Sequence, residues 1–172
     1  ITFPARLASL GREESDNVTE LGYSTVFASS ENFSDINVKE GGLYFSSSNG
    51  MLTNADGTEI LYCPINKAGV LTIPQNIRSV ADNVFNGLKR ITEVVIPGWV
   101  TNIGNKAFYN CDRVTKVTFK SGGSSFALEI GSYAFAECNN LAEIVFETNS
   151  NVKTIGEYAF YGCGNIETVK IA

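Results

Sequence analysis

The sequence predicts an α/β solenoid, a fold in which short repeated coils of the chain stack side by side. A six-residue pattern that ends in Phe recurs four times, at 80–85, 103–108, 130–135 and 155–160. Aliphatic residues follow each Phe at matching intervals, although the distance between successive Phe residues varies from 23 to 27 positions. A single unit of this kind cannot bury its own apolar side chains, so the units must stack to share a core.

The six-residue pattern itself predicts a turn with helical spacing. Three copies read Ile-Gly-x-x-Ala-Phe, and each has a Cys three residues after the Phe and an aliphatic residue three further on. Apolar residues at intervals of three predict a short helix or 3₁₀ turn on one wall of the solenoid. Gly104, Gly131 and Gly156 come just before this stretch, where we expect the chain to turn tightly.

The next part of each repeat predicts a strand. In Ile91-x-x-Val94-x-Ile96, one residue separates two aliphatic residues, and β-branched residues dominate the corresponding stretch of every copy. Such alternation is typical of a strand with one buried face. We therefore expect one short strand per repeat, and stacking joins these strands into a continuous parallel sheet opposite the helical turns.

The chain divides into three parts within a single solenoid domain that spans residues 1–172. Clear repeats occupy residues 70–172, and residues 1–38 hold two degenerate copies, one of which includes residues 21–26. From about 39 to 69 the period lapses, and Asn49-Gly50 and Asp56-Gly57 separate apolar pairs. These dipeptides favour tight turns, so we expect an inserted β-hairpin or small meander between two coils.

Residues 96–111 carry the most specific signal. They read Ile-Pro-x-x-Val-x-x-Ile-Gly-x-x-Ala-Phe-x-x-Cys, and several copies agree with this string. The string resembles the BspA-like, Treponema-type leucine-rich repeat family. The resemblance implies a right-handed leucine-rich-repeat superhelix with short parallel strands on one face and short helical or 3₁₀ turns on the other. It also implies a bacterial protein, secreted or at the cell surface, of a kind associated with adhesion to host proteins or other cells.

Composition argues against several classes of function. The 13 basic and 18 acidic residues give a net charge of -5, the wrong sign for a protein that binds nucleic acid through its phosphates. No stretch approaches the roughly 20 apolar residues of a membrane-spanning helix. The chain has no histidine, which is the commonest general base and metal ligand. We therefore expect no enzymatic activity, no cofactor, no metal and no insertion into a membrane.

Cys111, Cys138 and Cys163 occupy one position of the repeat and should form a column inside the solenoid. Equivalent residues of neighbouring strands lie about 4.8 Å apart with parallel side chains, whereas a disulfide needs converging Cβ atoms about 3.8 Å apart. We therefore interpret the column as reduced, buried thiols, in preference to a redox or metal site. Cys63 lies outside the column, and the sequence leaves open whether it is exposed and reactive. Residues 54–59 faintly resemble a calcium-binding loop but lack its full ligand set, so we expect a turn.

Outward positions on the expected strands are the candidate ligand-binding residues. Alternation places them in two outer columns, Glu93, Lys116, Glu143 and Thr168 in the first, and Val95, Thr118, Val145 and Lys170 in the second. Alternating charge in the first column also stabilises neighbouring strands, which is the simpler explanation for it. Trp99, the only tryptophan, follows a strand, where it either anchors a ligand or fills a local crevice.

These features favour a non-catalytic module that binds protein ligands on the exposed sheet face. Two alternatives stay open: a structural spacer within a larger cell-surface protein, and a carbohydrate-binding module that uses Trp99 and exposed tyrosines such as Tyr109 and Tyr161. Both ends of the chain fall in the strand phase of the repeat. We therefore expect either a trimmed piece of a longer array or end-to-end self-association through the edge of the C-terminal strand.

Overall fold

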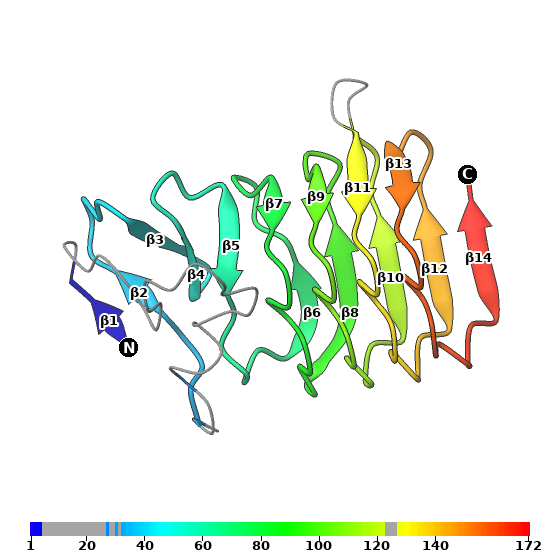
Figure 1. Ribbon diagram of the computed structural model, residues 1–172, viewed down its shortest axis with the longest axis horizontal. Coiled ribbons are helices and arrows are strands. Elements are labelled where there is room, and N and C mark those ends of the chain that lie inside the picture. The colour runs from blue at the N-terminus through cyan, green and yellow to red at the C-terminus, as the bar shows by residue number, and fades with distance from the viewer. Residues whose placement is uncertain (5–26, 28–29, 31, 123–126) are drawn as a thin grey trace.

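The computed structural model describes residues 1–4, 27, 30, 32–122 and 127–172 of the chain. These residues form an elongated stack of coils, with the N-terminus near one end and the C-terminus at the other (Figure 1). Strands from successive coils line up in two long sheets, and a short third sheet lies at the N-terminal end. The described residues contain strands and turns but no helix, and therefore none that could cross a membrane. The molecule is a β-solenoid.

The first long sheet contains the strands that the sequence predicts. Its members in order are β6 (Gly69–Thr72), β8 (Ile91–Ile96), β10 (Lys116–Phe119), β12 (Glu143–Phe146) and β14 (Thr168–Ile171). Every neighbouring pair is parallel. Val94, Val117 and Ile144 lie in register and are buried, because alternation turns every second side chain toward the core. The expected parallel sheet is confirmed.

A second long sheet lines another wall of the stack, where the sequence analysis expected strands only in the inserted hairpin or meander of about residues 39–69. It runs through β3 (Phe45–Ser48), β4 (Met51–Asn54), β5 (Glu59–Tyr62), β7 (Ser79–Val80), β9 (Asn102–Ile103), β11 (Leu128–Ile130) and β13 (Val152–Ile155). From β5 to β13 its pairs are parallel, and Val80, Ile103 and Ile130 turn into the core. The aliphatic residue that opens each six-residue pattern is thus the end of a strand, and each coil contributes two strands.

The turns that follow these strands are not helical, so the predicted helix or 3₁₀ turn is wrong for the described residues. Segments 82–87, 105–110, 132–137 and 157–162, which we call the turn ladder, have positive φ at their second and sixth residues. In the first segment these are Asn83, at 59°, and Gly87, at 72°. A left-handed residue at every fourth place interrupts helical geometry. Backbone groups bond to the next coil instead, and the N–H of Phe85 donates to the carbonyl oxygen of Ala107 at 2.8 Å.

The glycines that precede the turn ladder are required by contact between coils. A Cβ atom on Gly131 would lie 2.7 Å from the backbone nitrogen of Asn105, and one on Gly156 would lie 2.6 Å from that of Ser132. Neither glycine has a positive φ. The close approach of two backbones, and not a tight turn at the glycine, therefore explains why these positions lack a side chain.

The core is organised around a continuous column of Phe rings, as the repeat predicts. Ring centroids are 4.7 Å apart for Phe85 and Phe108, 4.8 Å for Phe108 and Phe135, and 5.3 Å for Phe135 and Phe160. The interplanar angle is 18° or less in each pair, and the first three rings are fully buried. Burial of each such ring stabilises the fold by about 1.5–3 kcal/mol, and stacking of each pair adds about 0.5–1.5 kcal/mol.

The segment expected to form a hairpin forms a three-stranded meander. β3 pairs antiparallel with β4, and β4 pairs antiparallel with β5. Asn49 and Gly50 join the first two strands with φ values of 49° and 73°, as in a type I′ turn. Because β5 also pairs parallel with β7, the meander forms the N-terminal edge of the second long sheet.

The predicted N-terminal repeats lie partly outside the described residues, which leave out 5–26. Within the described part, β1 (Thr2–Phe3) and β2 (Asn37–Val38) form the short parallel sheet. Phe33 and Ile36 are buried in a separate apolar cluster with Phe45 and Leu52 of the meander. The two degenerate repeats expected in residues 1–38 stay a prediction.

Candidate binding surface

The register of the five-stranded sheet confirms the two outer columns that the sequence predicts. Strand pairing aligns Glu93, Lys116, Glu143 and Thr168 in one column, and Val95, Thr118, Val145 and Lys170 in the next. Because alternate side chains of a strand point away from the core, both columns line the outer side of the sheet. We call these eight residues the sheet face.

Three of the four charged residues of the sheet face, Lys116, Glu143 and Lys170, bind one another. The Nζ of Lys116 lies 2.8 Å from Oε2 of Glu143, and the Nζ of Lys170 donates to Oε1 of the same carboxylate. Hydrogen bonds from Lys116 and then Lys170 lower the pKa of Glu143 to about 2. The hydrogen bond to Glu143 also raises the pKa of Lys116. The alternating charges therefore link neighbouring strands, as the simpler explanation requires.

The uncharged part of the sheet face presents a limited surface. Thr118 has only 8% of its surface exposed, and Val95 and Val145 on either side of it are partly buried. Thr168 on β14 is exposed. A ligand on this face would meet a row of β-branched side chains that paired charges border on one side.

Trp99 has partners within the protein. Its indole N–H donates to the carbonyl oxygen of Pro74 at 3.2 Å, and its ring packs against the core. Pro74 follows β6 in the preceding coil, so the tryptophan fills a crevice between two coils. Its role as a ligand anchor stays a prediction.

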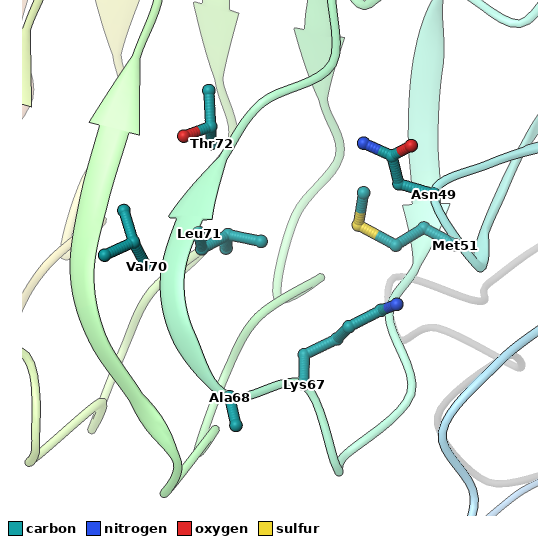
Figure 2. Close-up of a pocket in the computed structure, with 7 residues that line it drawn as sticks. All are labelled: Asn49, Met51, Lys67, Ala68, Val70, Leu71 and Thr72. Carbon is teal, nitrogen blue, oxygen red and sulfur yellow. The ribbon is translucent and has the colours of Figure 1, made fainter.

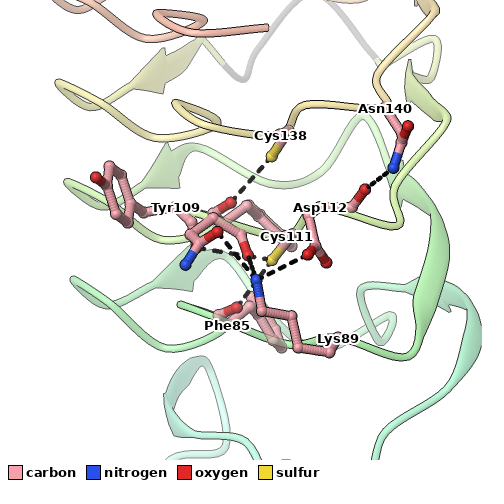
Figure 3. A network of polar contacts seen from close by, with 9 residues as sticks. Phe85, Lys89, Tyr109, Cys111, Asp112, Cys138 and Asn140 are labelled. Atoms are coloured by element: carbon pink, nitrogen blue, oxygen red, sulfur yellow. Dashed lines mark hydrogen bonds and ion pairs between the residues drawn. The ribbon is translucent and has the colours of Figure 1, made fainter.

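Each thiol of the cysteine column donates to a carbonyl oxygen of the preceding coil, and Figure 3 shows this for Cys111 and Cys138. The distances from Sγ are 3.0 Å for Cys111 to Phe85, 3.2 Å for Cys138 to Phe108, and 3.1 Å for Cys163 to Phe135. All three are free and buried. Contact with the Cys111 thiol, together with burial, raises the pKa of Cys138 to about 12. The interpretation of the column as reduced, buried thiols is therefore supported.

A cluster of polar contacts lies beside this column (Figure 3). The Nζ of Lys89 lies 2.9 Å from both the carbonyl oxygen and the side-chain oxygen of Asn110, and 3.1 Å from Oδ2 of Asp112. The Nδ2 of Asn140 donates to the carbonyl oxygen of Asp112. Lys89 thus contacts two residues of the next coil, and Asn140 contacts Asp112 of the coil before its own. The cluster therefore holds successive coils together.

Two other candidate sites have structural explanations. Cys63 is buried, and burial raises the pKa of its thiol, so it is not the exposed, reactive alternative. The Oδ1 of Asn54 accepts the N–H groups of Thr58 at 2.8 Å and Glu59 at 3.0 Å, which closes the turn expected at this place. Throughout the described ranges, no group of three or more His, Cys, Asp or Glu side chains is arranged to hold a metal ion.

A pocket of about 240 Å³ lies between β6 and the β3–β4 turn (Figure 2). Its lining residues are Asn49, Met51, Lys67, Ala68, Val70, Leu71 and Thr72. The Nζ of Lys67 is 3.1 Å from Oδ1 of Asp35, so the one charged group in the lining already has a partner. The volume is below the roughly 300–1,000 Å³ of typical small-molecule sites.

Three tyrosines form a group that the sequence analysis missed. Tyr109 and Tyr161 were named as exposed candidates for carbohydrate binding, but Tyr109 is partly buried and only Tyr161 is exposed. They are separated by the intervening coil, where Ala136 occupies the equivalent place. Tyr161 lies instead beside Tyr158, which stacks on Tyr133. Tyr133 and Tyr158 share one place in the repeat, the Tyr of Ile-Gly-x-Tyr-Ala-Phe. This recurrence was the signal in the sequence that could have found them.

Solved structures of known proteins share this architecture. A leucine-rich cell surface protein from Faecalibacterium prausnitzii A2-165 is 23% identical with a TM-score of 0.65, over 80% of this chain and 35% of that chain. The pneumococcal vaccine antigen PcpA is 23% identical with a TM-score of 0.67, over 78% of this chain and 32% of that chain. A leucine-rich repeat protein from Eubacterium ventriosum ATCC 27560 is 17% identical with a TM-score of 0.53, over 99% of this chain and 54% of that chain.

These likenesses concern the fold, and this chain spans about a third of the length of the first two proteins. A search of curated proteins finds no match. The sequence profile of the BspA type leucine-rich repeat region, by contrast, matches residues 61–172 in six copies. That range is well over half of the chain and contains all four segments of the turn ladder and all five strands of the first long sheet. The chain belongs to the BspA-type leucine-rich repeat family.

Proposed function

We propose that this chain is a non-catalytic binding module that recognises a protein ligand on the sheet face. One observation carries the proposal: four parallel strands, β8, β10, β12 and β14, pair in continuous register and present two unbroken outer columns. Stacked repeats commonly use such an extended surface for recognition. The family assignment supports a repeat module for binding or adhesion, and the ligand is the part we propose.

We also propose that the module works outside the cell or at the cell surface. The Faecalibacterium protein with the same fold is described as a cell surface protein, and PcpA is described as a vaccine antigen. The net charge of -5 disfavours nucleic acid as a partner. Adhesion to a host protein or another cell is consistent with this setting.

The structural spacer is the main alternative, and one observation favours it. Glu143 is bound by both Lys116 and Lys170, so three of the four charges of the sheet face satisfy one another without a ligand. The carbohydrate alternative is supported less, because Trp99 is held by Pro74 and the core. Self-association through the outer edge of β14 stays a prediction.

A binding screen with matched variants tests the proposal. The chain and the variants Val95→Arg and Val145→Arg are measured by biolayer interferometry against purified extracellular proteins and against a glycan array. Each arginine places a bulky charge on the sheet face, so we expect loss of at least about tenfold in affinity for a protein ligand, the cost of 1.4 kcal/mol. Thr154→Arg, at an exposed position of the seven-stranded sheet, is the control and should bind normally.

Circular dichroism and thermal unfolding establish that all three variants are folded before binding is compared. A protein ligand that binds the Val95 and Val145 variants as tightly as the native chain would contradict the sheet face as the site. No protein ligand in the screen would favour the spacer, and binding to glycans alone would favour the carbohydrate alternative.

A further inference from the structure

Three tyrosine side chains gather on the turn ladder, away from the sheet face. The rings of Tyr133 and Tyr158 stack with centroids 5.0 Å apart and an interplanar angle of 21°. Tyr161 meets Tyr158 nearly at a right angle, with centroids 5.9 Å apart and an angle of 86°. Tyr158 and Tyr161 are each 57% exposed. Tyr133 is partly buried, so the three rings form an aromatic corner with two exposed members, which we call the tyrosine corner.

Backbone geometry does not explain why tyrosine occupies these places. Tyr133 and Tyr158 both have a φ of 56°, a left-handed conformation that bulky side chains adopt rarely. The equivalent place in the first segment of the turn ladder holds Asn83, a residue type that adopts this conformation more easily. Residues with a strained backbone are concentrated at functional sites. The strain at Tyr133 and Tyr158 therefore indicates that the tyrosine side chains, and not the turn, are what these places require.

A carboxylate lies beside the backbone of the tyrosine corner. A Cβ atom on Gly162 would lie 2.7 Å from Oε1 of Glu137, which places that carboxylate over the backbone next to Tyr161. The backbone reinforces the contact, because the N–H of Glu137 donates to the carbonyl oxygen of Tyr161 at 2.7 Å. Glu157 precedes Tyr158 in the same segment and is exposed.

The two acidic residues at this corner are not neutralised by an ion pair within the described part of the chain. Elsewhere Glu143 is paired with two lysines, Glu147 with Lys120 at 2.6 Å, and Glu129 with Lys153 at 3.9 Å. Glu137 and Glu157, like Glu93 and Glu167, form no ion pair with any described residue. Both carboxylates at the corner are therefore available to a basic group of a ligand.

We propose that the tyrosine corner and Glu137 form a docking site for an arginine side chain of a basic protein segment. The faces of tyrosine rings attract cations, and the planar guanidinium group stacks on such rings. A carboxylate beside the rings completes the site, because arginine and carboxylate groups form strong, paired hydrogen bonds. This inference rests on the proposed function, because it also takes the ligand to be a protein. The tyrosine corner would be a second contact site for that ligand, on the turn ladder and not on the sheet face.

Titration with short peptides tests the site directly. The probe is an acetylated and amidated Gly-Arg-Arg-Gly peptide, followed through the NMR signals of the tyrosine rings. Peptides with lysine or glutamate in place of arginine, and a neutral trisaccharide, are titrated in parallel. We expect the arginine peptide to bind most tightly, the lysine peptide more weakly, and the glutamate peptide and the trisaccharide not to bind.

Variants then assign the contact to named residues. Tyr158→Leu should weaken binding of the arginine peptide about two- to fivefold, whereas Tyr158→Phe should leave it nearly unchanged, since a cation–π contact at an exposed site contributes about 0.5–1 kcal/mol. Glu137→Gln should weaken binding and reduce its dependence on salt. Tyr161→Leu gives a second test at the corner, and Tyr109→Leu, outside the corner, is the matched control.

The outcomes separate this site from the sheet face. Val95→Arg and Val145→Arg should not change binding of the arginine peptide, so failure of the sheet face leaves this result standing. Equal binding of the glutamate peptide, no effect of Tyr158→Leu and Tyr161→Leu in folded protein, or trisaccharide binding that displaces the arginine peptide would each overturn the proposal.

Discussion

The thiol of Cys138 donates a hydrogen bond to the carbonyl oxygen of Phe108, 3.2 Å away in the preceding coil. The side chain of the same residue, Phe108, stacks between the rings of Phe85 and Phe135. The cysteine column and the Phe column are therefore linked through the backbone, and each coil is joined to the next by both side-chain packing and a sulfur hydrogen bond.

The four cysteines should resist alkylation in the folded protein. All of them are buried, and the pKa of Cys138 is raised to about 12 from the model-compound value of 9.0. A raised pKa favours the neutral thiol in the folded state, whereas the thiolate is the reactive form. We expect iodoacetamide at about pH 8 to label none of the cysteines quickly in native protein and all four after unfolding, as mass spectrometry of the peptides can show.

The same shift has a consequence for stability at high pH. Because the thiol of Cys138 is neutral in both states below about pH 9, its contribution to stability is complete there. As pH rises from 9 toward 12, the unfolded chain loses the proton and the folded chain does not, so stability should fall.

For the alkylation experiment, rapid labelling of Cys63 or Cys138 in native protein at neutral pH would contradict their burial.

Substitution of Gly131 by alanine should separate two coils. The added Cβ atom would lie 2.7 Å from the backbone nitrogen of Asn105, and a backbone cannot move aside as a flexible side chain can. We expect Gly131→Ala to destabilise the fold by about 1–3 kcal/mol, typical of an overpacked core. Thermal unfolding should show a decrease of a few degrees per kcal/mol for a chain of this size.

Gly164→Ala is the matched control for this change. A Cβ atom on Gly164 meets nothing within 4 Å, and its φ is not positive. The control should unfold at nearly the native temperature. If both variants unfold alike, the close approach of coils is not what requires glycine at position 131.

The repeat could be predicted from the sequence because its core depends on residue type alone. Phe108 and Phe135 recur at a fixed place, and stacked coils must bring equivalent residues together. The second sheet was not predicted, because β7 and β9 are only two residues long and offer no alternation to recognise. The turn ladder was misread because consecutive β-turns and a 3₁₀ helix both place apolar residues three apart.

The candidate surface was predictable in position but not in environment. Strand alternation placed Thr118 on the outer side of the sheet, yet contact with its neighbours leaves only 8% of it exposed. The rings of Tyr133 and Tyr158 stack at a place where both residues have positive φ. The repeat aligns these two tyrosines, but the left-handed conformation, which tyrosine rarely adopts, could not be predicted from it.

Substitution of Glu143 by glutamine should change how the stability of the fold depends on pH. The pKa of Glu143 is lowered from 4.5 to about 2, mainly by the hydrogen bond from Lys116 and then by that from Lys170. A lowered pKa means that the stabilisation is present above about pH 4.5 and is lost as pH falls toward 2. The native chain should therefore exceed Glu143→Gln in stability at pH 7, and the difference should vanish near pH 2.

Urea unfolding across this pH range measures the difference. Glu167→Gln is the control, because Glu167 lies one residue before β14 and forms no ion pair with a described residue. It should not change the dependence of stability on pH. A difference between native and Glu143→Gln protein that stays constant down to pH 2 would mean that the ion pairs are not its cause.

Trp99→Phe distinguishes the two interpretations of the only tryptophan. Phenylalanine keeps most of the apolar contact with the core but cannot donate to the carbonyl oxygen of Pro74. If Trp99 fills a crevice, stability should decrease by about 0.5–1.5 kcal/mol, the net contribution of a typical hydrogen bond, while affinity for a ligand found in the binding screen stays unchanged. If Trp99 anchors the ligand, affinity should fall by more than stability does. Thermal unfolding and biolayer interferometry on the same preparation, with Tyr109→Phe as the control, therefore decide whether this aromatic residue serves the fold or the ligand.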